Sequence, residues 1–442
     1  MRALLVVMFL AVASPAMAEP KIAFERIELP NGLVVYVVED HRVPVVYEVM
    51  WVRVGSKDEA AGRTGFAHLF EHLMFKGSAH LPDGLMDRLL EEAGGYSTAF
   101  TTPDMTVYIN YAASNFVEQV LWIEADRLAG LLETFDKPKL DNQRSVVLNE
   151  RRQSYENRPY GNASLFLSEN LWPRGHGYNW PTIGLAADLK AAAPADVSAF
   201  FRKYYAPNNL TMVIAGDVKV ANVKALVEKY FAWIPRGADV VRPRYATPAP
   251  IAKQLVVDTT DDVQVPRIYL AWRGPASFGA DEPALDLAAA VLGGGKTSLL
   301  YKRFVYDEKI AQDVEVEWNG AELGGTLEIV ATAKPAVDPK RLAKEIAEEV
   351  AKLAAKGPDD AEVTRARSAH EAAFLRRLES VLGRSITLAT YAVQAKDPGF
   401  LAKDLARYRA VTAAQIKAVT AKYLGPNAHV TLTIRPGKKV IK

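Results

Sequence analysis

The sequence predicts an α+β protein of two homologous domains, each a largely antiparallel sheet with helices packed on it. The chain has 442 residues, enough for two or three domains. Two sequence patterns recur at nearly the same interval, and a proline-rich stretch separates their copies. Alternating β-branched stretches such as 33–38 and 45–54 are interleaved with helical stretches such as 84–92 and 115–132. This interleaving indicates helices packed on a sheet.

The internal repeat depends on two short patterns that occur in the same order in each half. A Val-Pro pair that precedes an apolar strand begins at Val43 and recurs at Val265, 222 positions later. A Lys-Tyr pair followed by Pro-Asn and a strand has its proline at Pro207 and again at Pro426, 219 positions later. Two signals with nearly equal spacing indicate a duplicated unit.

Between the two copies lies the stretch of the chain that is densest in proline, which neither a helix nor a central strand tolerates. We therefore predict a first domain at 19–234, a linker at 235–252 and a second, homologous domain at 253–442.

The first 18 residues have the pattern of a secretory signal peptide. Arg2 precedes an apolar run at 3–12, and Ala16 and Ala18 form a small-x-small cleavage site, so we predict a signal peptide at 1–18. A buried N-terminal helix is the alternative. The run is too short to cross a membrane, and no later segment approaches the required length, so we predict an exported protein without a membrane span.

Composition excludes several classes of function. The 54 Lys and Arg residues nearly balance 52 Asp and Glu residues, and the net charge of +2 does not indicate a nucleic-acid partner. The chain has no cysteine, which excludes disulfides, thiolate metal sites and cysteine nucleophiles. Any metal must therefore bind to His, Asp or Glu. A cysteine-free exported chain suits the periplasm of a Gram-negative bacterium.

One predicted helix, at 65–77, carries the chemistry. His68, Glu71 and His72 share one face because residues three and four apart are neighbours on a helix. Two imidazoles at this spacing can reach one zinc ion at about 2.0–2.1 Å, and the glutamate lies beside the position where water would bind. The apolar residues that should hold this helix in the core are Phe66, Leu69, Phe70, Leu73 and Phe75.

The pattern His68-x-x-Glu71-His72 is the inverted zinc motif of metallopeptidases. The same residues can occur by chance on a polar helix face, but unpaired imidazoles would be costly in so apolar a helix. We therefore predict one Zn²⁺ per chain, held in the first domain, with Glu71 as the general base. The second domain lacks the motif and is predicted to be non-catalytic.

With its duplicated α+β architecture and this motif, the chain resembles the pitrilysin, insulin-degrading enzyme and mitochondrial processing peptidase family of zinc metallopeptidases, as a short bacterial exported member. The residues alone require only some downstream carboxylate as third ligand. The resemblance identifies it as Glu150, which ends a pattern resembling R-x-V-V-x-x-E that begins at Arg144. A solvated acid on a helix face is the alternative. Relatives usually have a glutamate where this chain has Gln143, which can still hydrogen-bond a ligand or water.

The segment 94–101 resembles the edge strand with which this family binds the peptide backbone. The resemblance implies that Thr98, Ala99 and Phe100 bind substrate, although relatives commonly have Asn in place of Thr98. A simple turn and strand is the alternative.

Active members of the family also need an Arg and a Tyr, seven residues apart, that hold substrate and polarise its carbonyl. In this chain the two positions are Val305 and Gln312. The resemblance therefore implies a heterodimer in which a homologous non-catalytic subunit supplies the pair. Arg303 and Tyr306 lie close by in the sequence and could partly substitute, which leaves a homodimer open.

These observations predict a zinc endopeptidase that hydrolyses peptides or unfolded polypeptide segments. The closed chamber in which it would act is implied by the resemblance alone. One alternative is a subunit that retains zinc but serves binding or assembly in a peptidase complex without turnover. Another is a zinc hydrolase that acts on something other than peptides.

Overall fold

A computed structural model describes residues 19–440, so the predicted signal peptide at 1–18 lies outside the described residues. The first half contains β1 (Glu25–Glu28), β2 (Val34–Glu39), β3 (Val45–Val52), α1 (Phe66–Leu73), α2 (Leu85–Glu92), β4 (Tyr96–Thr101), β5 (Thr106–Ala113), α3 (Val117–Thr134), α4 (Lys137–Arg151), α5 (Ala163–Leu171), α6 (Ala186–Ala191), α7 (Pro194–Tyr204), β6 (Leu210–Gly216) and α8 (Val220–Phe231).

The second half contains β7 (Leu255–Asp261), β8 (Arg267–Arg273), α9 (Glu282–Gly293), β9 (Ala311–Asn319), β10 (Thr326–Ala333), α10 (Pro339–Lys356), α11 (Asp360–Glu379), α12 (Val381–Thr390), α13 (Leu401–Arg409), α14 (Ala413–Tyr423) and β11 (Val430–Pro436). Among the residues from 19 to 440, no helix combines the length and the apolar character that crossing a bilayer requires.

The two halves repeat one sheet topology, which confirms the predicted fold class of two homologous α+β domains. The first sheet has the order β1-β2-β6-β3-β5-β4, and the second has the order β7-β11-β8-β10-β9. Without β1, the two orders correspond strand for strand. In each sheet one pair is parallel, β2 with β6 and β7 with β11, and the other pairs are antiparallel. Strand β4 therefore lies at an edge of the first sheet, as β9 does in the second.

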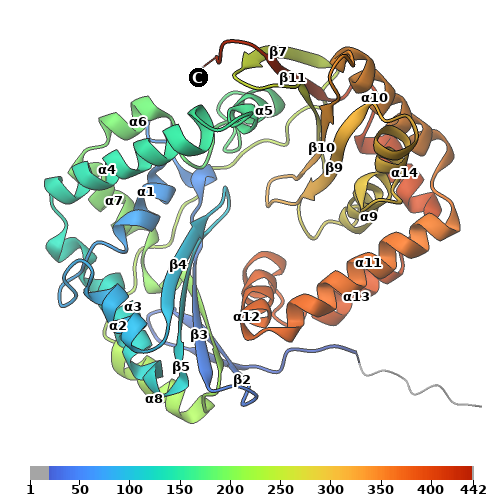
Figure 1. Ribbon diagram of the computed structural model, residues 1–442. Coiled ribbons are helices and arrows are strands. Elements are labelled where there is room, and N and C mark those ends of the chain that lie inside the picture. The colour runs from blue at the N-terminus through green and yellow to red at the C-terminus, as the bar shows by residue number, and fades with distance from the viewer. Residues whose placement is uncertain (1–18, 441–442) are drawn as a thin grey trace, which may run out of the picture.

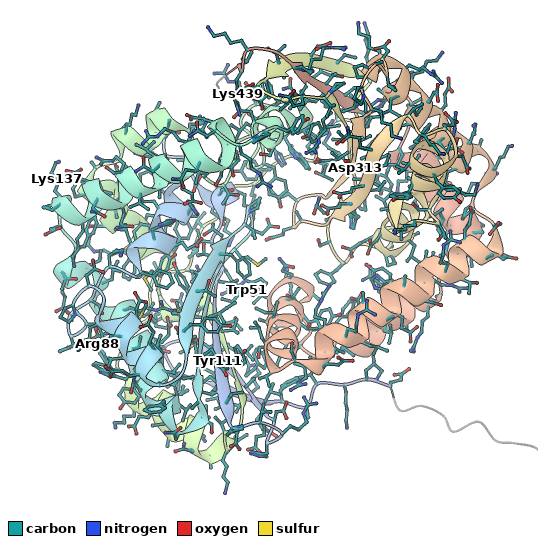
Figure 2. All side chains as sticks on the ribbon, viewed as in Figure 1. Trp51, Arg88, Tyr111, Lys137, Asp313 and Lys439 are labelled. Atoms are coloured by element: carbon teal, nitrogen blue, oxygen red, sulfur yellow. The ribbon has the colours of Figure 1, made fainter. Side chains whose placement is uncertain are left out.

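Each sheet is covered on one face by a helix from the other half of the chain (Figure 1). Trp51 on β3, labelled in Figure 2, belongs to an apolar cluster in which the first sheet packs against Leu388 and Ala389 of α12. Conversely, Phe166 and Leu167 of α5 belong to a cluster with strands β8 and β11 of the second sheet. Burial of apolar side chains thus joins the two domains in both directions.

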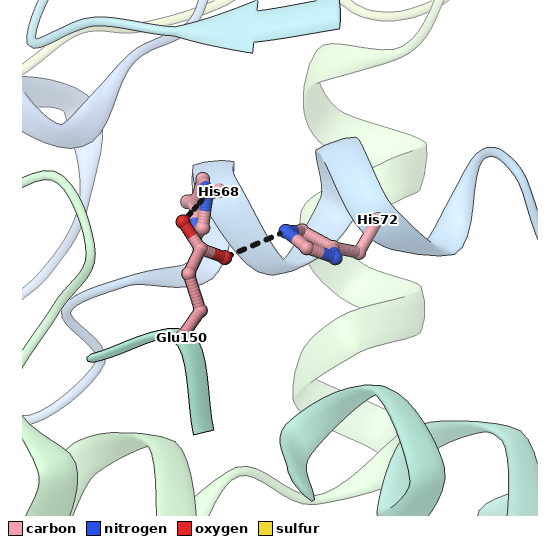
Figure 3. Close-up of side chains that lie close together, drawn as sticks. All are labelled: His68, His72 and Glu150. Atoms are coloured by element: carbon pink, nitrogen blue, oxygen red, sulfur yellow. Dashed lines mark ion pairs between the residues drawn. The ribbon is translucent and has the colours of Figure 1, made fainter. Parts of the chain in front are cut away.

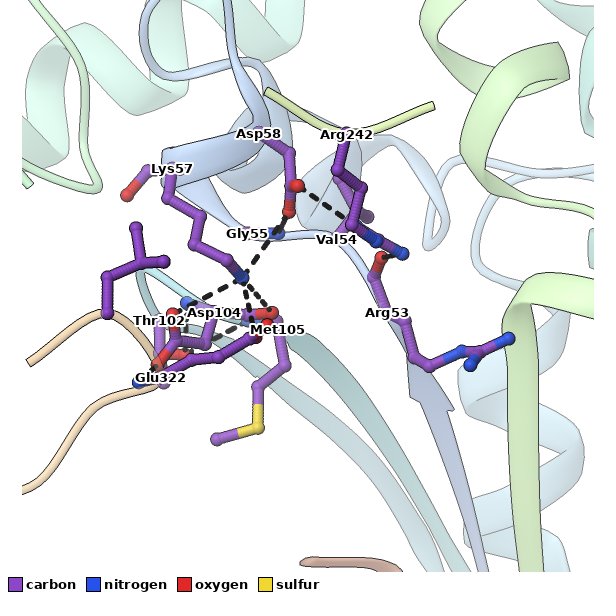
Figure 4. Close-up of polar contacts among 12 residues, drawn as sticks. Arg53, Val54, Gly55, Lys57, Asp58, Thr102, Asp104, Met105, Arg242 and Glu322 are labelled. Carbon is purple, nitrogen blue, oxygen red and sulfur yellow. Dashed lines mark hydrogen bonds and ion pairs between the residues drawn. The ribbon is translucent and has the colours of Figure 1, made fainter. Parts of the chain in front are cut away.

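A polar contact also joins the domains at the turn between β4 and β5 (Figure 4). Lys57 Nζ lies 3.2 Å from Asp104 Oδ1 and 3.1 Å from Glu322 Oε2, which comes from the turn between β9 and β10. The backbone N–H of Glu322 donates to Asp104 Oδ2 at 2.9 Å. Tyr178 donates its hydroxyl to Asp104 Oδ1 at 2.6 Å and accepts from the backbone N–H of Leu323. The end of β4 is therefore fixed against the second domain.

The stretch 235–252 contains no helix or strand and lies along the first domain. Arg242 Nη1 donates to the buried Asp58 Oδ1 at 2.9 Å, and the hydroxyl of Tyr245 donates to the backbone carbonyl of Lys57 at 2.6 Å. These contacts hold the stretch against the loop that precedes α1.

Candidate metal centre

The helix α1 begins at a turn that only glycine adopts easily, because Gly65 has a φ of 87°. The first N–H groups of a helix have no partner within it. Here the buried carboxylate of Glu59 accepts from the N–H of Gly65 at 2.9 Å and from that of Ala67 at 2.8 Å. Burial raises the pKa of Glu59 to about 8, and the two N–H donors oppose this rise.

The apolar side of α1 packs against α7. Phe66, Leu69, Phe70 and Leu73 are buried, as predicted, and Phe70 stacks on Phe200 with 5.1 Å between ring centroids. The helix is shorter than the predicted 65–77, because the N–H groups of Phe75 and Lys76 bond three residues back and the chain turns. Phe75 therefore lies beyond the helix and is half-buried.

Helix α4 brings Glu150 to the imidazoles of α1 (Figure 3). Glu150 Oε1 lies 3.6 Å from His68 Nε2, and Glu150 Oε2 lies 3.3 Å from His72 Nε2. The possible ligand atoms of the three residues all lie within 4.8 Å of one another. Two ligands of a tetrahedral zinc ion, each bonded at about 2.0–2.1 Å, are about 3.4 Å apart. The donor set and its spacing therefore fit a zinc ion.

The charge states of these residues also suit a metal. The pKa of His68 is lowered to about 4, chiefly by burial; the charge of Glu150 opposes this change and that of His72 adds to it. His68 therefore stays neutral, the form in which an imidazole binds a metal. The hydrogen bond with His72 lowers the pKa of Glu150, which keeps this carboxyl ionised. His68 Nδ1 is buried and has no hydrogen-bond partner among the described residues, so Nε2 is its only nitrogen in a polar contact.

The start of α4 is fixed by its N-cap, because Asp136 Oδ1 accepts from the N–H of Lys139 at 2.8 Å. Gln143 lies on the same helix two turns before Glu150 and is buried. Its side-chain amide donates to Asn142 Oδ1 at 2.8 Å, rather than to one of the three possible ligands.

Glu71 directly precedes His72 on α1 and has a partner that the sequence did not suggest. The hydroxyl of Thr101, at the end of β4, donates to Glu71 Oε2 at 2.5 Å. Burial raises the pKa of Glu71, whereas the Thr101 hydrogen bond and the charge of His72 lower it. Glu59 and Thr101 are thus two site residues that sequence reasoning missed. For Glu59, the available signal was an acid shortly before a helix whose N-cap is a glycine, which has no side chain to cap it. For Thr101, the signal was a hydroxyl residue directly after Phe100.

The residues predicted to bind substrate lie in the exposed edge strand β4. Thr98, Ala99 and Phe100 pair on one side with Ile109, Tyr108 and Val107 of β5, and β4 has no other neighbour in the sheet. Side chains of β4 alternate between exposed and half-buried. The strand therefore leaves main-chain groups available for a further strand.

The two residues that could replace the absent Arg and Tyr differ in their surroundings. Both lie in a π-helix at Tyr301–Asp307. The guanidinium of Arg303 is held by three carboxylates, those of Glu308, Glu345 and Glu349, at 2.6, 3.2 and 2.6 Å. Tyr306 is 72% exposed.

Comparisons with known proteins identify the family. A family model described as insulinase, peptidase family M16, matches residues 34–175, and one described as peptidase M16 inactive domain matches residues 192–369. The chain belongs to the peptidase M16 (pitrilysin) family. This confirms the resemblance found in the sequence.

Relatives in the family include named zinc proteases. The zinc protease PqqE of Helicobacter pylori is 28% identical over 84% of this chain and 83% of its own length. The probable mitochondrial-processing peptidase subunit beta of Arabidopsis thaliana is 26% identical over 90% of this chain and 75% of its own. The crystal structure of a protease from Helicobacter pylori superposes with a TM-score of 0.88 at 26% identity, over 94% of this chain and all of that one. The name of the first of these relatives makes zinc the metal that the family suggests.

Proposed function

We propose that this chain is a zinc-dependent endopeptidase of peptides or unfolded polypeptide segments. The observation that carries the proposal is the grouping of His68, His72 and Glu150 at zinc-ligand spacing, with Glu71 on the same face of α1. A subunit that only retained zinc would need the three ligands but would have no use for a fourth, general-base carboxylate.

His68, His72 and Glu150 would hold the zinc ion. A bound zinc ion supplies Lewis-acid polarisation of the scissile carbonyl and makes a nearby water more acidic. Glu71 accepts the proton of the attacking water and passes it to the leaving amine. Burial raises the pKa of Glu71, which makes it a stronger base than a solvated carboxylate.

The substrate would bind as an added strand along β4. Backbone groups of Thr98, Ala99 and Phe100 would form the hydrogen bonds, because the outer side of β4 has no neighbour in the sheet. Such binding requires an extended chain, so folded proteins would be poor substrates.

We further propose that the active protein contains a second, homologous subunit that closes a chamber over the site and supplies an Arg and a Tyr. Arg303 is engaged by three carboxylates, which argues against its acting on substrate. A partner is also in keeping with the name of the plant relative, which is one subunit of a peptidase. Without such a subunit, a homodimer that uses the exposed Tyr306 is the remaining arrangement.

The protein would work in the periplasm of a Gram-negative bacterium. The support is the signal-peptide pattern at 1–18 and the absence of cysteine.

The test uses quenched fluorescent peptides with the purified chain, alone and with any homologue from the same export compartment. We expect cleavage by the wild type. Glu71→Gln should abolish turnover while the zinc content stays at one ion per chain. Equal cleavage by the wild type and Glu71→Gln would contradict the proposal. Zinc binding without cleavage by any combination would favour the assembly subunit. Full activity of the chain as a monomer would exclude the need for a partner.

A further inference from the structure

The contact between Thr101 and Glu71 links the edge strand to the base. Thr101 ends β4 directly after the three residues proposed to pair with substrate, and its hydroxyl donates to Glu71 Oε2 at 2.5 Å. A hydrogen bond to an ionised carboxylate is among the stronger kinds in proteins. The same strand therefore bears the proposed substrate contacts and a direct contact with the base.

The single hydroxyl proton of Thr101 has one good acceptor. The other oxygen within reach is Thr106 Oγ1 at 3.4 Å, on the residue opposite in β5. Thr106 is itself fully buried and donates to the backbone carbonyl of Val54 at 3.0 Å. Glu71 is thus the closer and more basic acceptor, and the bond engages Oε2 while Oε1 stays available for proton transfer.

Hydrogen bonds and ion pairs fix the position of the chain at the end of β4. Thr102 accepts from the N–H of Ser56 at 3.2 Å, and Pro103 accepts from that of Lys57 at 2.9 Å. Asp104 then takes the contacts with Lys57, Tyr178 and Glu322 described above. The position of the Thr101 hydroxyl is therefore set by both domains.

We propose that Thr101 is a positioning residue that fixes the carboxylate of Glu71 relative to the substrate strand. The inference rests on the proposed function, because it assigns a role in peptide hydrolysis. A carboxylate at the end of a flexible side chain can rotate away from the attacking water. The Thr101 hydroxyl prevents this rotation, and it ties the orientation of the base to the strand along which the substrate would bind.

The test compares Thr101→Val, which keeps the shape but removes the hydroxyl, with Thr101→Ser, which keeps the hydroxyl. Misplacing a reacting group by about 1 Å costs up to about 100-fold in rate, so Thr101→Val should lower kcat about 10- to 100-fold. KM and zinc content should stay near wild type, and Thr101→Ser should recover most of kcat. Wild-type kcat in Thr101→Val would overturn the proposal.

Thr64→Val is the matched control for a purely structural effect. The hydroxyl of Thr64 also donates to a carboxylate, Asp188 Oδ2, at 2.7 Å, just before α1, but it does not contact Glu71. This variant should lose thermal stability and keep kcat near wild type. A loss of kcat equal to that of Thr101→Val would overturn the proposal, because any weakening around α1 would then have the same effect.

A second measurement needs neither metal nor turnover. Thermal unfolding of the metal-free chain is compared for Thr101→Val, Glu71→Ala and the double variant. The two single effects should not add, because each removes the same hydrogen bond. Strictly additive effects would overturn the proposal. If the wild type cleaves no peptide under any condition, the proposed function fails and this inference falls with it; if the wild type is active, the outcomes above concern Thr101 alone.

Discussion

The carboxylate of Glu59 accepts a hydrogen bond from the backbone N–H of Ala67 at 2.8 Å, and so caps the helix that carries His68 and His72. The same carboxylate accepts from Gly65. A buried acid thus replaces the side-chain cap that Gly65 cannot provide. The alignment of the two imidazoles depends on this contact, since α1 is only eight residues long.

Glu59→Ala should therefore weaken both the fold and the metal site. Loss of the cap leaves two N–H groups buried without a partner, at about 1–3 kcal/mol each. Zinc affinity should fall about 10- to 100-fold, as for loss of other groups that orient metal ligands. Urea unfolding and chelator competition measure the two effects. Glu59→Gln keeps one acceptor oxygen, so its stability and zinc affinity should lie between those of the wild type and Glu59→Ala. Wild-type zinc affinity in Glu59→Ala would contradict the prediction.

Zinc should stabilise the chain through His68, His72 and Glu150. A ligand present at 100 times its Kd stabilises the folded state by about 2.7 kcal/mol, so zinc should raise Tm and a chelator should reverse the rise. Calorimetry with and without zinc measures the shift. It should vanish in His72→Ala and Glu150→Gln but persist in Glu71→Gln. Loss of the shift in Glu71→Gln would show that Glu71 is a ligand rather than a base.

Lys57→Met should destabilise the junction between the domains. The ammonium group is buried among Asp58, Asp104 and Glu322, and these charges raise its pKa against the effect of burial. Removing one partner of a buried ion pair costs about 3–5 kcal/mol. Chemical denaturation checks this value. The side chain of Glu322 is 55% exposed, so Glu322→Gln should cost only about 0–1 kcal/mol. Equal losses for the two variants would contradict the buried-pair account.

Glu328 should make stability fall as pH rises. Burial and the charge of Glu317, which lies directly opposite in β9, raise the pKa of Glu328 to about 7 in the folded state. A raised folded-state pKa contributes stability that is complete below about 4.5 and is lost as pH rises through about 7. Glu328→Gln should therefore increase Tm more at pH 8 than at pH 4.5. The exposed Glu315, changed to Gln, serves as the control. An equal increase at both pH values would count against this explanation.

The sequence predicted best what depends on local periodicity. His68, Glu71 and His72 share a face because the helical repeat fixes it, and the repeated strand patterns became two sheets of the same order. Glu150 was different. Many acids follow the motif, and only the family resemblance singled one out, because the approach of α4 to α1 is a tertiary contact.

The contacts that the sequence did not predict join segments far apart in the chain. Thr101 meets Glu71 across 30 positions, and nothing in either segment specifies the pairing. The apolar side of α12 predicts burial but does not say against which sheet, and it packs on the first sheet rather than on that of its own domain. Such choices depend on the whole packing arrangement, which periodicity does not describe.

Helix α5 of the first half packs on the second sheet, and α12 of the second half packs on the first sheet. Each half of the chain therefore contributes apolar side chains to the core of the other. A gene divided within the codons for 235–252 would produce two fragments, each exposing a bare apolar sheet face and prone to aggregate alone. Synthesised together, the fragments could complement each other and rebuild the fold.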